Sequence, residues 1–240
     1  GDSTKEETYA ALMDGRKANL VITDPPYASG GSTPAEKTRS TNQKYSSMPA
    51  DKALPDFAGD QMDQRSWTNF MTDWLNEAYR LCKPGAPICL FIDWRQYPSL
   101  SDAMQRAGWI WRGVAVWDKV TCRPQKGRFR QQAEFILWGS KGAMPLQRNV
   151  GCLPGVFRYT NSANAGRIHV TEKSLPLMRD IVQICEPGGR ILDPFAGAGT
   201  TILAAVREGY EAVGIEKTAV YYKLGSDRVK FALAAGEKAK

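Results

Sequence analysis

Short apolar runs alternate with segments of helical periodicity along most of this chain. Runs typical of buried strands cover residues 20–22, 88–92, 110–117, 133–138, 190–192 and 213–215. Apolar residues recur at helical spacing in residues 67–81, 100–107, 174–185, 200–208 and from 219 onward. Such alternation is typical of a doubly wound α/β fold with a mostly parallel sheet. Because 240 residues suit one fold of this kind, we predict a single domain over residues 1–240.

Two segments interrupt the alternation. Residues 28–64 are rich in Ser, Thr, Gly and Pro and show no sustained period, which predicts a long loop. Residues 139–168 contain Gly, Asn and Pro and are also irregular. Loops of this length inside a compact domain usually carry function or move, so we predict that residues 28–64 form a mobile loop.

Positive charge is concentrated between residues 119 and 173. This segment holds ten Lys and Arg against two Glu, whereas the whole chain has a formal net charge of +7. A basic segment on a nearly neutral body is typical of a protein that binds a polyanion. Aromatic residues such as Phe129 and Trp138 are interleaved with the cations, which favours nucleic acid as the polyanion. The residues that we predict to contact it are Arg123, Lys126, Arg128, Arg130, Lys141, Arg148 and Arg158.

The rest of the composition argues against several other classes of protein. Five cysteines lie at wide spacings without a CxxC pair, which is unlike a disulfide framework and fits a reducing cytosol. Because His169 is the only histidine, we predict no metal site. No apolar run approaches the roughly 18 residues of a membrane helix, and no signal peptide opens the sequence. We therefore expect a cytoplasmic protein without a membrane segment.

A glycine-rich turn follows the predicted strand 190–192. Gly197 and Gly199 allow the backbone to approach a ligand closely, and Thr200 begins the next predicted helix, whose first N–H groups are free to bind it. Glu216 lies 19 residues beyond Gly197, after the next strand, where a carboxylate can accept hydrogen bonds from both hydroxyls of a ribose. The pattern predicts a nucleoside cofactor, although an ordinary strand-to-helix turn has the same spacing.

The residues around that turn favour one cofactor. A dinucleotide site carries a third glycine, which is replaced here by Ile202, and the Asp193 carboxylate would repel a diphosphate. The same carboxylate suits a cofactor whose amino-acid end is cationic. We therefore predict S-adenosylmethionine, with Asp193 at its methionine end, Phe195 packing nearby and Glu216 at its ribose.

A second turn joins Asp24, Pro25, Pro26 and Tyr27 after the predicted strand 20–22. The prolines fix the backbone and leave the Pro25 carbonyl free to accept a hydrogen bond. With the Asp24 carboxylate as a second acceptor and the Tyr27 ring as a stacking face, the turn suits a planar amine on an aromatic ring. Holding both N–H groups draws the nitrogen lone pair out of conjugation and aims it at an electrophile. A rigid turn without a catalytic role is the alternative interpretation.

Together the two turns, Asp-Pro-Pro-Tyr and Asp-Pro-Phe-Ala-Gly-Ala-Gly-Thr, resemble the motifs of the DNA amino-methyltransferases that form N6-methyladenine or N4-methylcytosine. The catalytic motif precedes the cofactor motif by 169 residues, which is similar to the circularly permuted motif order of the β group. The resemblance extends over nearly the whole chain and implies a Rossmann-like fold, S-adenosylmethionine as cofactor and S-adenosylhomocysteine as product.

Shorter motifs carry the resemblance further. Residues 1–3 are similar to an acidic motif of that group, which implies that Asp2 lies near the adenine of the cofactor. Residues 169–173 resemble an element that holds the methionine end, which implies cofactor contacts for Thr171 and Lys173. Relatives of this group often pair, so the resemblance also admits a homodimer.

These observations lead to one hypothesis for the function. Double-stranded DNA docks on the basic segment, and the target base is flipped out because its amine cannot be reached inside the stack. Residues 28–64 would contact the target, and residues 139–168 would form a short recognition region, which implies brief or relaxed sequence readout. Asp at the first motif position tends to accompany adenine in this family and Ser cytosine, so Asp24 favours adenine.

Other functions stay open at this point. The amine could belong to cytosine, and the substrate could be RNA. A module that binds DNA or cofactor without catalysis is a further alternative, although Asp24 and Tyr27, whose loss would indicate it, are both present. The resemblance favours a bacterial or phage-type enzyme that acts on DNA in the cytoplasm.

Overall fold

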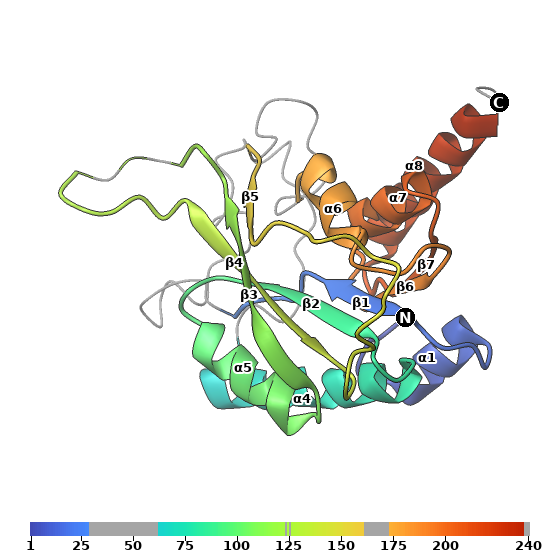
Figure 1. Cartoon of the computed structure of the whole chain (residues 1–240), viewed down its shortest axis with the longest axis horizontal. Helices are drawn as coiled ribbons and strands as arrows, with labels where there is room; N and C mark the ends of the chain where they lie inside the picture. Colours follow the sequence, from blue (N-terminus) through green and yellow to red (C-terminus); the bar gives the residue numbers. More distant parts are fainter. Residues whose placement is uncertain (29–61, 123, 125, 161–172, 238–240) are drawn as a thin grey trace.

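The computed structural model describes residues 1–28, 62–122, 124, 126–160 and 173–237. Their centre is a seven-stranded sheet with the strand order β5-β3-β4-β2-β1-β6-β7 (Figure 1). The strands are β1 (Leu20–Thr23), β2 (Pro87–Ile92), β3 (Ile110–Asp118), β4 (Ala133–Ser140), β5 (Val156–Arg158), β6 (Arg190–Asp193) and β7 (Glu211–Gly214). The order places the two strands that precede the predicted motifs, β1 and β6, side by side in the sheet.

Six of the seven strands run in the same direction. Strand β1 pairs in parallel with β2 and β6, and β6 with β7, while β3 pairs in parallel with β5. Only β4 is reversed, since it is antiparallel to both of its neighbours, β2 and β3. The prediction of a doubly wound α/β fold with a mostly parallel sheet is confirmed.

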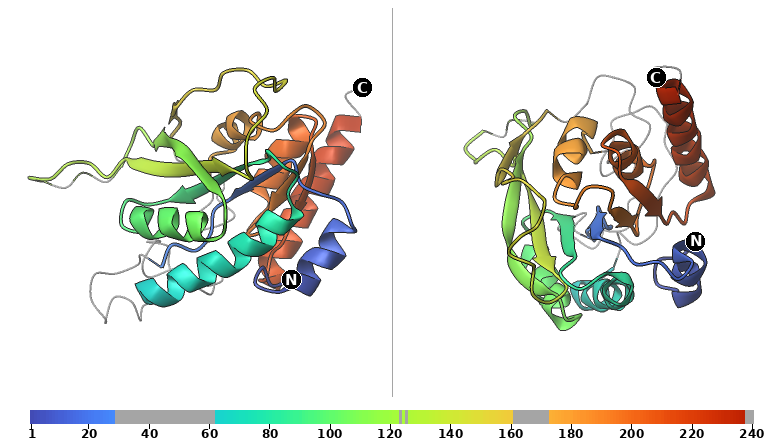
Figure 2. Two further views of the ribbon diagram at one scale, coloured as in Figure 1. Left: turned by 60° about the horizontal axis from the view of Figure 1, so that its bottom comes forward. Right: turned by 45° about the vertical axis from the view of Figure 1, so that its right-hand side comes forward.

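Helices cover both faces of the sheet (Figure 2). On one face lie α1 (Glu6–Met13), α4 (Gln64–Leu81) and α5 (Tyr97–Arg106), and on the other lie α6 (Leu175–Val182) and α7 (Thr200–Arg207), with α8 (Ala219–Glu237) packed against α7. Strand β1 shows why its sequence is uniformly apolar: Val21 joins the core under the first layer, whereas Leu20 and Ile22 join the core under the second. A strand buried on both faces has no polar alternation.

Two elements were not expected from the sequence. Helix α1 buries only Tyr9 and Met13, so its apolar stripe is too short to stand out from a polar segment. Strand β5 consists of three residues, of which only Phe157 is buried, and it extends the sheet by pairing with β3. It lies inside the segment 139–168 that the sequence predicts to be irregular. A run this short has no measurable periodicity.

Several predictions concern residues outside the described part of the chain. They are the greater part of the loop 28–64, Thr171, His169 and Arg123. Among the residues that are described, no helix is long and apolar enough to cross a membrane.

Candidate active site at the carboxyl edge of the sheet

The polar residues predicted from the two turns meet at one edge of the sheet. Asp24 follows β1, Asp193 ends the adjacent strand β6, and Glu216 comes two residues after β7. In open α/β sheets, ligands bind outside the carboxyl ends of the strands. Because β4 is reversed, its first residues lie at this edge too, and they bring Glu134 to it. We call this side of the sheet the carboxyl edge.

The glycine-rich turn is shaped by two residues with positive φ. Gly199 has φ 77° and precedes α7, and a Cβ there would lie 3.1 Å from the Cα of Gly225 on α8. Gly197 has φ 51° and no heavy atom within 4 Å of the place of a Cβ, so the turn is open on that side. The Gly197 N–H donates to Glu216 Oε2 at 2.9 Å, which joins the turn to the end of β7.

Asp193 lies beneath this turn and is only 1% exposed. Its Oδ1 accepts hydrogen bonds from the hydroxyl of Thr23 at 2.6 Å and from the backbone N–H of Phe195 at 3.0 Å. Burial, with a smaller contribution from the nearby Asp24, raises the pKa of Asp193 to about 6, against the opposing effect of hydrogen bonds from Thr201, Thr23 and the Phe195 backbone. The carboxylate therefore supports the turn and joins β6 to β1.

Phe195, the next side chain in the turn, packs edge-to-face against two rings of helix α4. Its ring centroid lies 5.8 Å from that of Phe70 and 5.2 Å from that of Trp74. Phe195 therefore fixes the turn against α4.

Asp2 lies near the same end of β7. The nitrogen of Gly1 donates to the backbone carbonyl of Glu216 at 2.8 Å, and Lys217 Nζ lies 2.8 Å from Asp2 Oδ2. Hydrogen bonds from Lys217 and from the Thr4 backbone hold the pKa of Asp2 below its usual range. The structure therefore brings the acidic motif of residues 1–3 next to Glu216, although the two are far apart in sequence.

The Asp-Pro-Pro-Tyr turn is fixed from α4. Trp67, a fully buried residue, donates its indole N–H to the Pro26 carbonyl at 2.6 Å. No described residue donates a hydrogen bond to the carbonyl of Pro25, and the Asp24 side chain is 24% exposed. The two acceptors that the sequence predicts for an amine are thus both present at the carboxyl edge.

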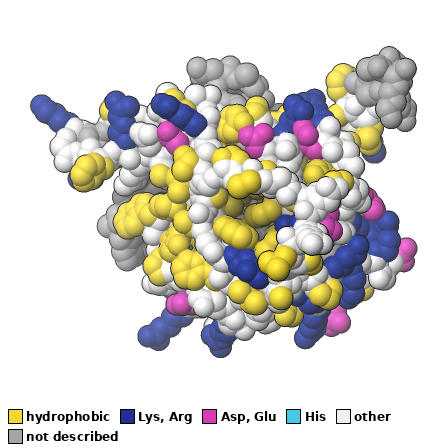
Figure 3. Space-filling view, viewed as in Figure 1, with side chains coloured by type: hydrophobic (Ala, Val, Ile, Leu, Met, Phe, Trp, Pro, Cys, Tyr) yellow, Lys and Arg dark blue, Asp and Glu magenta, His cyan; other side chains and the backbone are white. Residues whose placement is uncertain are grey.

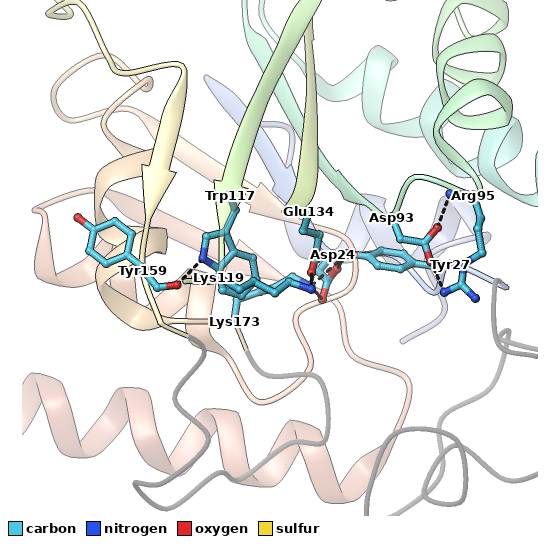
Figure 4. A network of polar contacts seen from close by, with 9 residues as sticks. All are labelled: Asp24, Tyr27, Asp93, Arg95, Trp117, Lys119, Glu134, Tyr159 and Lys173. Atoms are coloured by element: carbon cyan, nitrogen blue, oxygen red, sulfur yellow. Dashed lines mark hydrogen bonds and ion pairs between the residues drawn. The ribbon is translucent and has the colours of Figure 1, made fainter. Parts of the chain in front are cut away.

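Asp24 belongs to a cluster of five polar side chains (Figure 4). We call Asp24, Tyr27, Lys119, Glu134 and Lys173 the Asp24 cluster. Lys173 Nζ lies 2.9 Å from Asp24 Oδ2 and 2.5 Å from Glu134 Oε1. The Tyr27 hydroxyl lies 2.6 Å from Asp24 Oδ1, 2.6 Å from Glu134 Oε1 and 3.1 Å from Lys173 Nζ. Lys119 Nζ completes the cluster at 2.7 Å from Glu134 Oε2.

Three aromatic rings surround the Lys173 ammonium. Its Nζ lies 5.3 Å from the ring centroid of Tyr27, 5.2 Å from that of Phe91 and 5.9 Å from that of Trp117. Contacts of this length between a cation and an aromatic face are attractive. Trp117 is itself held by the hydrogen bond from its indole N–H to the Tyr159 carbonyl at 2.8 Å. The lysine is therefore fixed within the site, with 10% of its side chain exposed.

The charges of the Asp24 cluster influence one another strongly. Burial raises the pKa of Asp24, and Glu134 adds to that effect while Lys173 opposes it. Burial also acts to raise the pKa of Glu134, but Lys173 and Lys119 outweigh it and lower this pKa to about 2. The pKa of Lys173 is raised, because Asp24 and Glu134 outweigh the desolvation of the ammonium. Glu134 and Lys173 are therefore charged at neutral pH, and Asp24 is the carboxylate of the cluster whose charge is more easily lost.

Sequence reasoning missed part of this cluster. Lys173 was expected beside the cofactor from the resemblance, whereas the structure places it against Asp24. Glu134 and Lys119 were not predicted as site residues. Glu134 is the only acid between residues 119 and 171, a signal that could have marked it.

The predicted nucleic-acid contacts fall into two groups. Lys126, Arg128 and Arg130 are exposed on the connection between β3 and β4, which projects from the body at the carboxyl edge (Figure 1). Between the two arginines, Phe129 is 98% exposed, and basic and apolar side chains share this projection in the space-filling view (Figure 3). Arg158, at the end of β5, is also exposed at this edge.

Two of the predicted cations lie at the opposite edge. Lys141 Nζ donates to the carbonyls of Tyr79 and Cys82, which precede β2. Arg148 donates to the carbonyl of Ile184, which precedes β6. Their charges stabilise carbonyls at the amino ends of strands, so we leave both out of the nucleic-acid surface proposed below.

The described residues contain no group of three His, Cys, Asp or Glu side chains that could hold a metal ion.

Comparison with solved structures identifies the fold. The crystal structure of the M1.HpyAVI–SAM complex superimposes with a TM-score of 0.67 at 23% identity, over 95% of this chain and 96% of that one. The PvuII DNA methyltransferase, described as cytosine-N4-specific, superimposes with a TM-score of 0.68 at 16% identity, over 95% of this chain and 84% of that one. The architecture is that of these DNA methyltransferases.

Sequence comparison identifies the family. YubD of Escherichia coli strain K12, whose name places it among the methylases, is 28% identical over 221 residues, which cover 91% of this chain and 85% of YubD. The family model described as DNA methylase, N6_N4_Mtase, matches residues 18–227 and so includes both turns and the whole Asp24 cluster. The chain belongs to the N6_N4 family of DNA methylases.

Proposed function

We propose that this chain transfers a methyl group from S-adenosylmethionine to the N6 amine of an adenine flipped out of double-stranded DNA. The observation that supports this most directly is the pair of acceptors at the carboxyl edge, the partly exposed Asp24 carboxylate and the Pro25 carbonyl without a described donor. Both are fixed by buried neighbours, and they follow the strand that lies beside the glycine-rich turn.

The residues around the glycine-rich turn fit this cofactor. Gly197 leaves open space beside the turn, and the Glu216 carboxylate stands next to it, where it can accept hydrogen bonds from a ribose. Asp2 lies beside Glu216, and Phe195 offers an apolar ring. Asp193 adds negative charge beneath the turn, which favours a cationic amino-acid end. When bound, S-adenosylmethionine supplies an electrophilic methyl group.

The chain's own residues prepare the amine. The Asp24 carboxylate and the Pro25 carbonyl accept hydrogen bonds from the two N–H groups of the target amine. These hydrogen bonds draw the nitrogen lone pair out of conjugation with the ring. The Asp24 carboxylate also offers a base for the proton that the nitrogen loses on methylation. Trp67 holds the turn rigid, so the two acceptors are in place before the amine arrives. The rate enhancement therefore comes mostly from positioning and electrostatic stabilisation, and the mechanism has no covalent enzyme intermediate.

The choice of adenine rests on Asp24, since Asp at this position tends to accompany adenine in the family and Ser cytosine. N4 of cytosine is the second candidate, because the PvuII enzyme of similar fold is described as cytosine-N4-specific. Nucleoside mass spectrometry of unmethylated DNA incubated with the protein and S-adenosylmethionine distinguishes the two. N6-methyladenine supports the proposal, and N4-methylcytosine keeps the mechanism but contradicts the choice of base. RNA should remain unmodified, and the absence of any methylated base in DNA would contradict the proposed activity.

The exposed cations of the β3–β4 connection are the proposed docking surface for DNA. Replacing Lys126, Arg128 and Arg130 together by Ala removes three phosphate-binding charges, and each such charge contributes about −0.9 to the slope of log Kobs against log[salt]. We expect the slope to become shallower by about 2.7. Fluorescence anisotropy with a labelled duplex, at salt concentrations from about 50 to about 200 mM, measures this slope.

A matched control removes the same amount of charge elsewhere. Lys83, Arg106 and Lys230 are exposed on other parts of the molecule, and their triple Ala variant should change the slope by less than about 1. Equal changes in the two triple variants would mean that only the net charge matters and would remove the β3–β4 connection as the docking surface.

A further inference from the structure

Lys173 is not a solvated lysine. Its ammonium has hydrogen-bonding contacts with Asp24, Glu134 and the Tyr27 hydroxyl, which match the three donors of an ammonium group. Three aromatic rings surround it, and it lies two residues before the start of α6, whose apolar side is packed into the core. A side chain held at so many points has little freedom to leave Asp24.

Glu134 is bound from two sides. Its Oε1 faces Lys173 and Tyr27, while its Oε2 faces Lys119, and the side chain is 7% exposed. The glutamate therefore stands between two ammonium groups, and only one of these contacts Asp24 directly. Removing Glu134 would leave Lys173 with Asp24 as its sole carboxylate, whereas removing Lys173 would leave two carboxylates that share the single proton of the Tyr27 hydroxyl.

The charged groups that face Asp24 come from several elements. Tyr27 shares its turn, Lys119 follows β3, Glu134 is the second residue of β4, and Lys173 precedes α6. The neighbouring strand ends contribute the buried Asp193 of β6, and the ion pair of Asp93 with Arg95 after β2 (Figure 4). Within the Asp24 cluster itself, two carboxylates and two ammonium groups balance to zero.

We propose that Lys173 and Glu134 are positioning residues for the methylation: Lys173 keeps Asp24 ionised, and Glu134, which has the opposite charge, shares the Lys173 ammonium, so that Asp24 stays oriented toward the target amine. The inference rests on the proposed function, because it concerns the carboxylate that accepts the amine. Lys173 favours the charged form of Asp24, and Glu134 limits how tightly Lys173 pairs with it. The Tyr27 hydroxyl connects the two carboxylates and fixes the orientation of the side of Asp24 that remains exposed.

The test is the pH dependence of kcat/KM, whose acid limb reports the ionisation of Asp24 in the free enzyme. Lys173→Met removes the cation, so protonation of Asp24 becomes easier and the acid limb should move to higher pH by about one unit or more. Glu134→Gln removes the competing carboxylate, so the limb should move to lower pH by a similar amount. The double variant loses one charge of each sign, and its limb should return toward that of the wild type.

Opposite displacements distinguish positioning by charge from a structural role. A loss of packing would lower kcat in both variants without moving the limb in opposite directions. Lys223→Met, which removes an exposed ion pair of α8, is the matched control and should leave the profile unchanged. Binding of S-adenosylmethionine, measured by calorimetry, should stay within about threefold of the wild type in every variant. The melting temperature of each variant reports its folding.

Two results would overturn the inference. In one, the acid limb of Glu134→Gln stays at the wild-type pH or moves to higher pH. This result overturns the inference even if Lys173→Met does not fold. In the other, Lys173→Met weakens cofactor binding and leaves the limb in place, which returns Lys173 to the cofactor site. Failure of the proposed function is a separate result, because then the wild-type protein itself methylates no base at any pH.

Discussion

Asp24→Asn should lower kcat by about 10³-fold and leave the affinity for S-adenosylmethionine within about threefold of the wild type. The asparagine keeps the size of the side chain and one acceptor oxygen. That oxygen is required by Lys173, whose Nζ lies 2.9 Å from Asp24 Oδ2, so the amide NH₂ turns toward Tyr27 and the exposed side. A donor then faces the N–H groups of the target amine, and the lone pair is no longer released. The residues proposed to hold the cofactor are unchanged.

Steady-state methylation of a duplex under multiple turnover, with product nucleosides measured by mass spectrometry, gives kcat, and calorimetry gives the cofactor affinity. Asp227→Asn, the same replacement in an exposed ion pair of α8, serves as the control and should methylate at the wild-type rate. Turnover of Asp24→Asn within tenfold of the wild type would exclude Asp24 as the acceptor of the amine. A parallel loss of cofactor binding would mean that the carboxylate acts on the cofactor side of the site.

The strands and turns that could be predicted from the sequence are those marked by a local pattern of residue types. The runs of β1 and β2 are apolar throughout because both faces of these strands are buried, and turns that contain Gly or Pro mark their ends. The Asp-Pro-Pro-Tyr turn and the glycine-rich turn were recognisable for the same reason, since each is a contiguous segment whose residue types have a direct chemical meaning. Their meeting in space follows from the pairing of β1 with β6, which a doubly wound sheet makes expected.

The Asp24 cluster was not predictable in this way. Lys119, Glu134 and Lys173 belong to no common motif, and they meet because β4 alone is reversed and starts at the edge where the other strands end. The direction of a strand cannot be predicted from a short apolar run of residues. For the same reason, the basic segment could not be divided from sequence into cations near the site and cations at the opposite edge, such as Lys141 and Arg148.

Asp193→Asn should stabilise the free protein at neutral pH while it weakens cofactor binding. The folded pKa of about 6 lies above the ordinary value of 3.8, so between these values the folded state holds a proton that the unfolded chain has lost. The contribution of this carboxyl to stability therefore falls as pH rises from about 4 to above 6, by up to about 3 kcal/mol. Asparagine is never ionised, which removes that cost, and its amide oxygen can still accept from Thr23 and the Phe195 N–H.

Urea unfolding of both proteins at pH 5 and pH 7.5, without cofactor, tests the sign of this effect. The variant should exceed the wild type by about 1–3 kcal/mol at pH 7.5, and the difference should shrink toward pH 5, where Asp193 is itself protonated in the folded state. If the variant is less stable at both pH values, the charged carboxylate stabilises the turn, and its burial carries no net cost. Higher stability and weaker cofactor binding are expected together. In the free protein, the buried charge of Asp193 lowers the stability because it has no cationic partner. In the complex, the same charge is favourable because the cationic end of the ligand lies nearby. Asp193 would then be retained for binding at the expense of stability.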